Sequence, residues 1–214
     1  MENDMILFTG FEPFDNAKTN PSFEAVRLLP SKIKGARVEK LELPVVFGEA
    51  AEMIINRIGC ETPEAVIMTG VAAGRDKITP EVTAVNLADA RIPDNAGHSP
   101  KWERIIPDGP DGIFSTLPVR EMVSAMEAAG LAAGLSHSAG TYVCNDTFYR
   151  VCSYVRTRGL DIPCGFIHVP NPKGTDKGTE MTVEDFALAL EICAESVIEV
   201  ISRKTTSRLE RSSL

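Results

Sequence analysis

The sequence predicts an α/β fold, a single three-layer α/β/α domain built around a mixed, mostly parallel sheet. Apolar runs of strand length alternate along the chain with segments whose apolar residues recur at helical spacing, which is the pattern of strand–helix–strand units. Hydrophobic residues make up 43% of the 214 residues and charged residues 24%. A chain of this size and composition can bury a sizeable core without disulfide bonds.

The first half of the chain contains three expected strands and two expected helices. Residues 5–9 are an apolar run that ends at a glycine, and residues 21–28 begin with proline, which is favoured in the first turn of a helix. Residues 37–43 are the second expected strand. Residues 47–58 carry one apolar stripe with helical spacing, and residues 64–69 are a third apolar run that ends at a glycine.

The middle of the chain changes character. Residues 71–118 are dense in glycine, proline, aspartate and asparagine, so we expect extended strands and long loops, which often carry function. A helix over residues 119–129 and a short strand over residues 131–135 are expected next. Apolar residues then recur at helical spacing from Cys144 onward, so a helix begins at or just before that cysteine.

The last elements are a strand over residues 162–169, which ends at a proline, and a final helix. Thr182 and Asp185 have the spacing of a capping box and mark the start of that helix. We expect the domain to cover residues 1–203, and we expect residues 204–214 to form a polar, disordered tail.

Charge and composition exclude several classes of protein. The net charge is −8 and the basic residues are dispersed, whereas nucleic-acid binding needs a basic face. The first residues lack the pattern of a signal peptide, and no segment approaches the roughly 18 apolar residues of a membrane span. We therefore expect a cytoplasmic protein without nucleic-acid or membrane partners.

Cysteines and histidines are too scattered for a metal site. The five cysteines form no Cys-x-x-Cys pair and the three histidines are isolated, which argues against zinc and against a disulfide framework. No Gly-Lys-Ser/Thr or G-x-G-x-x-G motif occurs, so no nucleotide cofactor is expected.

The chemistry-bearing residues follow strand ends, where ligands bind in open α/β sheets. Cys144 begins a helix behind a loop of small residues, and a helix N-terminus favours the thiolate; the alternative is that Cys144 is the first buried residue of its apolar stripe. His168 ends a strand and shares a face with Cys164 and Phe166. It is placed to act as a general base or to serve as a structural residue, and His137 competes with it by proximity to Cys144.

A thiol and an imidazole that work together usually need a third group to hold the ring. The sequence alone leaves four acidic candidates open, namely Glu81, Asp89, Asp94 and Asp146.

Five motifs, taken together, resemble the pyroglutamyl peptidase I family, also called pyrrolidone-carboxylate peptidases. They are Thr9-Gly10-Phe11-Glu12-Pro13-Phe14, Asn20-Pro21-Ser22, Asp89-Ala90-Arg91-Ile92-Pro93-Asp94-Asn95, Ser138-Ala139-Gly140-Thr141-Tyr142-Val143-Cys144-Asn145 and Gly165-Phe166-Ile167-His168-Val169-Pro170. The likeness spans about residues 5–201. It implies a catalytic triad of Cys144, His168 and Glu81, hydrolysis of an N-terminal pyroglutamyl residue from peptides through a thioester, no cofactor, and a homotetramer.

A pocket for the neutral, flat pyroglutamyl lactam needs apolar and aromatic walls. We expect Phe11, Phe14 and Tyr142 to form it, although the phenylalanines could instead be core residues; family members often have Phe in place of Tyr142. Arg91 could assist at the oxyanion or could hold the loop at Asp94 and Asn95. Two alternative functions are a cysteine hydrolase of another cyclic or blocked amide and a non-catalytic binding homologue.

Overall fold

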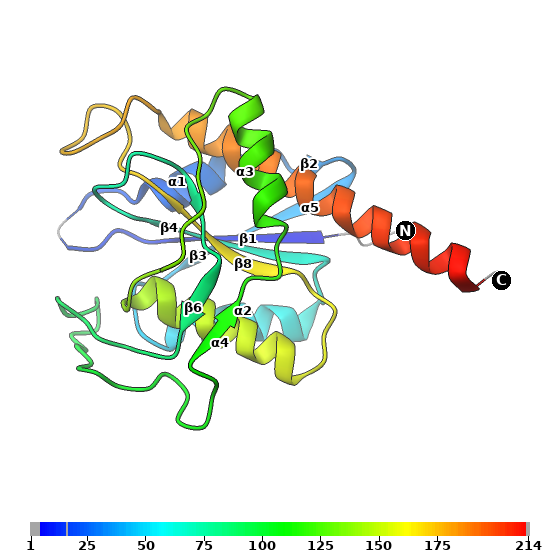
Figure 1. Ribbon diagram of the computed structural model, residues 1–214. Helices are drawn as coiled ribbons and strands as arrows, with labels where there is room; N and C mark the ends of the chain where they lie inside the picture. The colour runs from blue at the N-terminus through cyan, green and yellow to red at the C-terminus, as the bar shows by residue number, and fades with distance from the viewer. Residues whose placement is uncertain (1–4, 16, 213–214) are drawn as a thin grey trace.

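The computed structural model describes residues 5–15 and 17–212. They form three layers, a central sheet with helices on each of its two faces (Figure 1). The sheet has the strand order β2-β3-β1-β4-β8-β5. Its strands are β1 (Met5–Phe11), β2 (Lys32–Ile33), β3 (Ala36–Leu43), β4 (Ala65–Val71), β5 (Thr79–Pro80) and β8 (Cys164–Val169). Strands β3, β1, β4 and β8 are parallel, and β2 and β5 are antiparallel at the two edges. The predicted α/β class and mostly parallel, mixed sheet are confirmed.

Helices cover both faces of the sheet (Figure 1). Helices α2 (Glu49–Cys60) and α4 (Val143–Thr157) pack on the face that we call the site face. Helices α1 (Pro21–Leu28), α3 (Val119–Ala128) and α5 (Val183–Ser212) pack on the opposite face, which we call the far face. Each face therefore has its own buried apolar layer, and the sheet separates the two.

Alternation along β4 and β8 decides which residues reach the site face. The two strands are paired in register, Val66 with Cys164, Met68 with Phe166 and Gly70 with His168. Residues of this set pack with α2 and α4, whereas Ile67, Ile167 and Val169 pack with the far-face helices. The predicted sharing of one face by Cys164, Phe166 and His168 is confirmed.

The edges of the sheet differ from expectation. Residues 131–135 form no strand, and their contact with the sheet region is a single bridge between Ile78 and Ala133. The edge beside β8 is taken by β5, so the apolar run packs on the far-face core instead. At the other edge the short strand β2, which the sequence analysis missed, pairs with β3 across Lys34 and Gly35. Both have positive φ, 46° and 90°, as a tight two-residue hairpin turn requires.

Helix α5 begins as predicted and ends later than predicted. Thr182 N donates to Asp185 Oδ2 at 2.8 Å, and Asp185 N donates to Thr182 Oγ1 at 3.3 Å, which is the expected capping box. The helix continues to Ser212, beyond the expected domain boundary at residue 203. The hydroxyls of Thr205 and Thr206 bond to carbonyls one turn earlier, and no proline or glycine interrupts the stretch.

Apart from β5, residues 72–118 form long loops and one small antiparallel ribbon, as expected for their composition. The ribbon pairs β6 (Thr83–Val85) with β7 (Gly112–Phe114). Among the described residues, no helix combines the length and the apolar character that crossing a bilayer requires.

Candidate functional site

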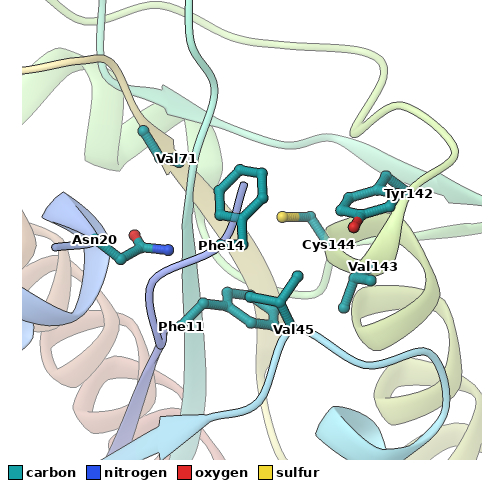
Figure 2. Close-up of a pocket in the computed structure, with 8 residues that line it drawn as sticks. All are labelled: Phe11, Phe14, Asn20, Val45, Val71, Tyr142, Val143 and Cys144. Carbon is teal, nitrogen blue, oxygen red and sulfur yellow. The ribbon is translucent and has the colours of Figure 1, made fainter. Parts of the chain in front are cut away.

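A small, largely apolar pocket lies at the carboxyl ends of the parallel strands (Figure 2). Its walls come from the loops that leave β1, β3 and β4 and from the start of α4. The lining residues are Phe11, Phe14, Asn20, Val45, Val71, Tyr142, Val143 and Cys144. The structure thus brings together Phe11, Phe14, Tyr142 and Cys144, which the sequence analysis had singled out. It adds Val45 and Val71, which the sequence did not single out, and Asn20 and Val143, which belong to the motifs quoted above but had no assigned role.

Cys144 is the second residue of α4, and its side chain points into this pocket (Figure 2). The long loop segment holds the start of the helix in place. Asn145, which is fully buried, accepts from Val85 N at 2.9 Å and donates to the carbonyls of Val85 and Leu87 at 2.9 and 3.1 Å. Residues 72–118 therefore contribute to the site by anchoring the helix that carries the thiol.

The absence of a side chain at Gly70 lets the Cys144 sulfur lie against the sheet. A Cβ atom at Gly70 would lie 2.8 Å from Cys144 Sγ and 2.8 Å from Phe166 Cζ, both closer than side-chain packing tolerates. Gly70 is also the register partner of His168, and the rings of Phe166 and His168 lie 4.8 Å apart. The thiol and the imidazole therefore occupy the same face and the same end of the sheet.

Strand β5 brings Glu81 to His168. Thr79 and Pro80 pair antiparallel with β8, and Glu81 N donates to Phe166 O at 2.8 Å. The carboxylate that follows is fully buried, and its Oε1 lies 2.6 Å from His168 Nδ1. His168 Nε2 has no hydrogen-bond partner among the described residues, so this nitrogen is available to a reacting group.

The other acidic candidates are occupied elsewhere. Asp94 accepts hydrogen bonds from the backbone of Phe47, Ala96 and His98. Asp146 accepts from Gly48 N and pairs with Arg150. Within the described part of the chain, neither carboxylate contacts His168, and the same is true of Asp89. His137, the competing histidine, is exposed.

Arg75 is the residue that the sequence analysis missed and that the geometry makes prominent. Its Nη1 lies 2.6 Å from Glu81 Oε1, and its Nη2 donates to Ser138 O at 3.0 Å. The guanidinium thus binds the same carboxylate oxygen as His168. The sequence offered one indication of this contact, because Arg75 lies six residues before Glu81 in the loop that follows β4.

Burial dominates the protonation of the site. It raises the pKa of Cys144 to about 12; the charge of Glu81 adds to this effect and the charge of Arg75 opposes it. The helix N-terminus therefore does not by itself make Cys144 a thiolate, because loss of hydration outweighs the helix.

Burial also lowers the pKa of His168, against the opposing influence of Glu81. For Glu81, burial is the largest single influence and favours the acid, but the hydrogen bond and the charge of His168, together with hydrogen bonds from Ser136 and Arg75, outweigh it and lower the pKa. The site at neutral pH thus holds a neutral thiol, a neutral imidazole and a carboxylate. Such a set can pass the thiol proton to the imidazole when a nucleophile is needed.

Arg91 lies away from the pocket, whereas Tyr142 lines it as expected. Arg91 is exposed and lies outside the pocket lining, and it makes no hydrogen bond or ion pair with the residues that the structure describes. Tyr142 lines the pocket while its hydroxyl donates to Pro93 O at 2.9 Å. Its ring packs edge-on against Phe47 at 5.4 Å, so the hydroxyl ties a neighbouring loop to the pocket wall.

No group of three or more potential metal ligands exists among the described residues.

The chain is similar to known peptidases along most of its length. The model of the pyroglutamyl peptidase family matches residues 4–202. The pyrrolidone-carboxylate peptidase of Levilactobacillus brevis is 48% identical over 77% of this chain and 81% of that protein. The protein of the same name from Thermococcus kodakarensis is 40% identical over 93% of this chain and 98% of that protein.

Solved structures agree. The pyroglutamyl peptidase I of Bacillus amyloliquefaciens superimposes with a TM-score of 0.87 at 35% identity, covering 91% of this chain and 95% of that one. The pyrrolidone carboxyl peptidase of Thermococcus litoralis gives a TM-score of 0.89 at 32% identity, covering 94% and 96%.

Proposed function

The chain belongs to the pyroglutamyl peptidase family, and from this membership we propose that it removes an N-terminal pyroglutamyl residue from peptides, with Cys144 as nucleophile, His168 as proton carrier and Glu81 as the group that orients His168. One observation carries the assignment. The pocket ends at the Cys144 thiol, and that thiol lies against Gly70, the register partner of a histidine held by a buried carboxylate.

The pocket suits a neutral lactam. Phe11, Phe14 and Tyr142 supply aromatic walls, and Val45 and Val71 supply aliphatic ones. No acidic or basic side chain lines the pocket among the described residues, which fits a ring without charge.

Asn20 is the polar side chain in the pocket that can form a hydrogen bond with the lactam ring. Its Oδ1 accepts from Ser22 N at 3.1 Å and from Ser22 Oγ at 2.8 Å, and its Nδ2 donates one hydrogen to Glu12 O at 2.9 Å. The amide is therefore fixed in orientation. Its second hydrogen is free for the lactam carbonyl, and a buried donor of this kind rejects rings that lack an acceptor.

In the proposed cycle, His168 Nε2 takes the proton from the Cys144 thiol as sulfur attacks the pyroglutamyl carbonyl. The imidazolium then gives this proton to the leaving amine, and a pyroglutamyl thioester remains. Water, activated by the now neutral His168, hydrolyses the thioester and regenerates the thiol. Glu81 keeps Nδ1 protonated and stabilises the cation that forms in between.

The start of α4 is the proposed oxyanion site. Tyr142 at the N-cap supplies no side-chain acceptor, so the N–H groups of the first turn remain available to a developing negative charge beside Cys144. The exposed position of Arg91 does not support a direct role for it in this step.

Hydrolysis of pyroglutamyl-aminomethylcoumarin tests the proposal. We expect release of the fluorophore by the unaltered protein and no detectable turnover by Cys144→Ala. Cys60→Ala, at an exposed cysteine outside the site, should keep full activity. Full activity of Cys144→Ala would refute the nucleophile. Preference for alanyl or glutamyl amides, or for another blocked amide, would indicate one of the alternative hydrolases. Inactivity of the unaltered protein on every amide would indicate a binding homologue.

A further inference from the structure

A second pair of thiols lies on the site face, away from the substrate pocket. Cys152 Sγ and Cys164 Sγ are 3.0 Å apart, and both cysteines are free and buried. Closing this contact to the roughly 2.05 Å of a disulfide needs a movement of about 1 Å. Cys152 belongs to α4 and Cys164 to β8, so the pair joins the helix that carries Cys144 to the strand that carries His168.

The surroundings make the two sulfurs unequal. The hydrogen bond from Cys152 lowers the pKa of Cys164, and Thr116 Oγ1, which lies 3.8 Å from Cys164 Sγ, supports the same direction. Burial raises the pKa of Cys152. Cys164, whose sulfur accepts from the Thr116 hydroxyl, is the better placed of the two to carry a thiolate, and Cys152 lies beside it as the second thiol.

A cavity gives small molecules a route to the pair. It has a volume of about 460 Å³ and lies between α4, β8 and β7 (Gly112–Phe114). Cys152 and Cys164 both line it, and none of its lining residues belongs to the pocket at Cys144. An oxidant of a few atoms can therefore approach the pair through this cavity, where Cys152 is 3% and Cys164 1% exposed, without entering the substrate pocket.

We propose that Cys152 and Cys164 form a reversible oxidation site at which a hydroperoxide converts the two thiols into a disulfide. The Cys164 thiolate attacks one peroxide oxygen, the O–O bond breaks, and Cys164 becomes a sulfenic acid as hydroxide leaves. Cys152 sulfur then attacks Cys164 sulfur, the S–O bond breaks, and the proton of Cys152 leaves with that oxygen as water. Two thiols lose two electrons in total, and hydrogen peroxide is reduced to two molecules of water.

The remaining cysteines lack this arrangement. Cys60 is exposed, and Cys193 lies on the far face, where its sulfur faces Met126 Sδ at 3.8 Å. A thioether cannot form a disulfide, so Cys193 serves as a buried control. The oxidised pair would tie α4 to β8 whether or not Cys144 acts as proposed.

The test uses Cys144→Ser, so that oxidation of the candidate nucleophile does not enter the count. Four of the five cysteines then remain. The folded protein is treated with hydrogen peroxide, unfolded and labelled with N-ethylmaleimide. We expect two labels instead of four, a tryptic cross-link between peptides 151–156 and 159–173, and recovery of all four labels after treatment with dithiothreitol.

Two variants in the same background separate this site from general thiol oxidation. Cys193→Ala should retain the cross-link, whereas Cys152→Ala should lose it and accumulate oxygen on Cys164. Four labels after peroxide would overturn the proposal, and so would a cross-link to Cys60 or Cys193. The peptide map of the parent protein decides the outcome even where a variant folds poorly.

Discussion

The two faces of the central sheet are built from the same strands but have different chemistry. On the far face, β4 and β8 contribute Ile67, Ile167 and Val169 to an apolar layer under α1, α3 and α5. On the site face, the alternate residues of these strands end in Gly70 and His168. The site face thus keeps an apolar layer along most of these strands, and only its last positions, at the carboxyl ends, hold residues of the site.

Two buried cysteines, Cys144 on the site face and Cys193 on the far face, show the same difference between the faces. Burial raises the pKa of Cys144 and of Cys193 to about 12 each. The neighbours of Cys144 also include Glu81 and Arg75, whereas no charged group contributes to the pKa of Cys193. Burial alone therefore does not activate a thiol. The difference between the faces lies in the charged and hydrogen-bonding groups that surround the sulfur.

The largest change in kcat is expected on removing the charge of Glu81, the carboxylate of the site. No such change is expected for a carboxylate on a far-face helix. Glu81→Gln keeps the size of the side chain but removes the charge that supports the His168 cation. We expect kcat on pyroglutamyl-aminomethylcoumarin to fall on the order of 10³-fold, within the range for general acid–base catalysis.

Glu199→Gln is the matched control for Glu81→Gln. Glu199 lies on α5 and pairs with Lys34 at the surface, so its loss should leave kcat unchanged. A Glu81→Gln enzyme with unaltered kcat would return Glu81 to a purely structural role and remove the proposed contrast between the faces.

A pair of glycines in neighbouring strands gives the second test. A Cβ at Gly70 meets Cys144 Sγ and the Phe166 ring, whereas a Cβ at Gly165 points to the far face and meets Ser115 and Leu117. Gly70→Ala should lower kcat/KM about 10²-fold, because a displacement of about 1 Å at a reacting group has that effect. Gly165→Ala should lower the free energy of unfolding by roughly 1–3 kcal/mol through overpacking.

Activity per folded molecule and urea unfolding distinguish the two glycine variants. Gly165→Ala should retain its kcat in the folded fraction, because Ser115 and Leu117 lie away from the pocket. The proposed difference between the two glycines would be contradicted if Gly70→Ala lowered only the free energy of unfolding. It would also be contradicted if Gly165→Ala lowered only the turnover.

Features set by local pattern could be predicted from the sequence. The period of two in β8 placed Cys164, Phe166 and His168 on one face, and the spacing of Thr182 and Asp185 placed the start of α5. The gathering of strand exits around Cys144 followed from the parallel sheet.

Features set by contacts between distant segments could not. Arg75 reaches Glu81 because β5 turns back along β8. Asn145 forms hydrogen bonds with Val85 and Leu87, which lie 60 and 58 residues earlier in the chain. The pKa of Cys144 depends on how completely α4 and the sheet exclude water, which a helix-terminus argument omits. The family resemblance, rather than any local pattern, selected Glu81 among four acids.

The smallest change in activity is expected on substituting Arg75, whose guanidinium binds Glu81. Its positive charge lowers the pKa of His168, so Arg75→Gln should raise that pKa. Turnover needs the neutral imidazole. The acid limb of the kcat/KM profile should therefore move to higher pH, and activity at the optimum should fall by about tenfold or less, the equivalent of one hydrogen bond.

Arg75→Lys separates charge from geometry at this position. A lysine restores the positive charge near Glu81 but not the second hydrogen bond to Ser138 O. It should therefore return the acid limb toward its original pH while leaving part of the loss in kcat. If both variants kept the original acid limb, Arg75 would act only as a brace between Glu81 and the loop before α4. The site face would then owe its protonation to burial and Glu81 alone.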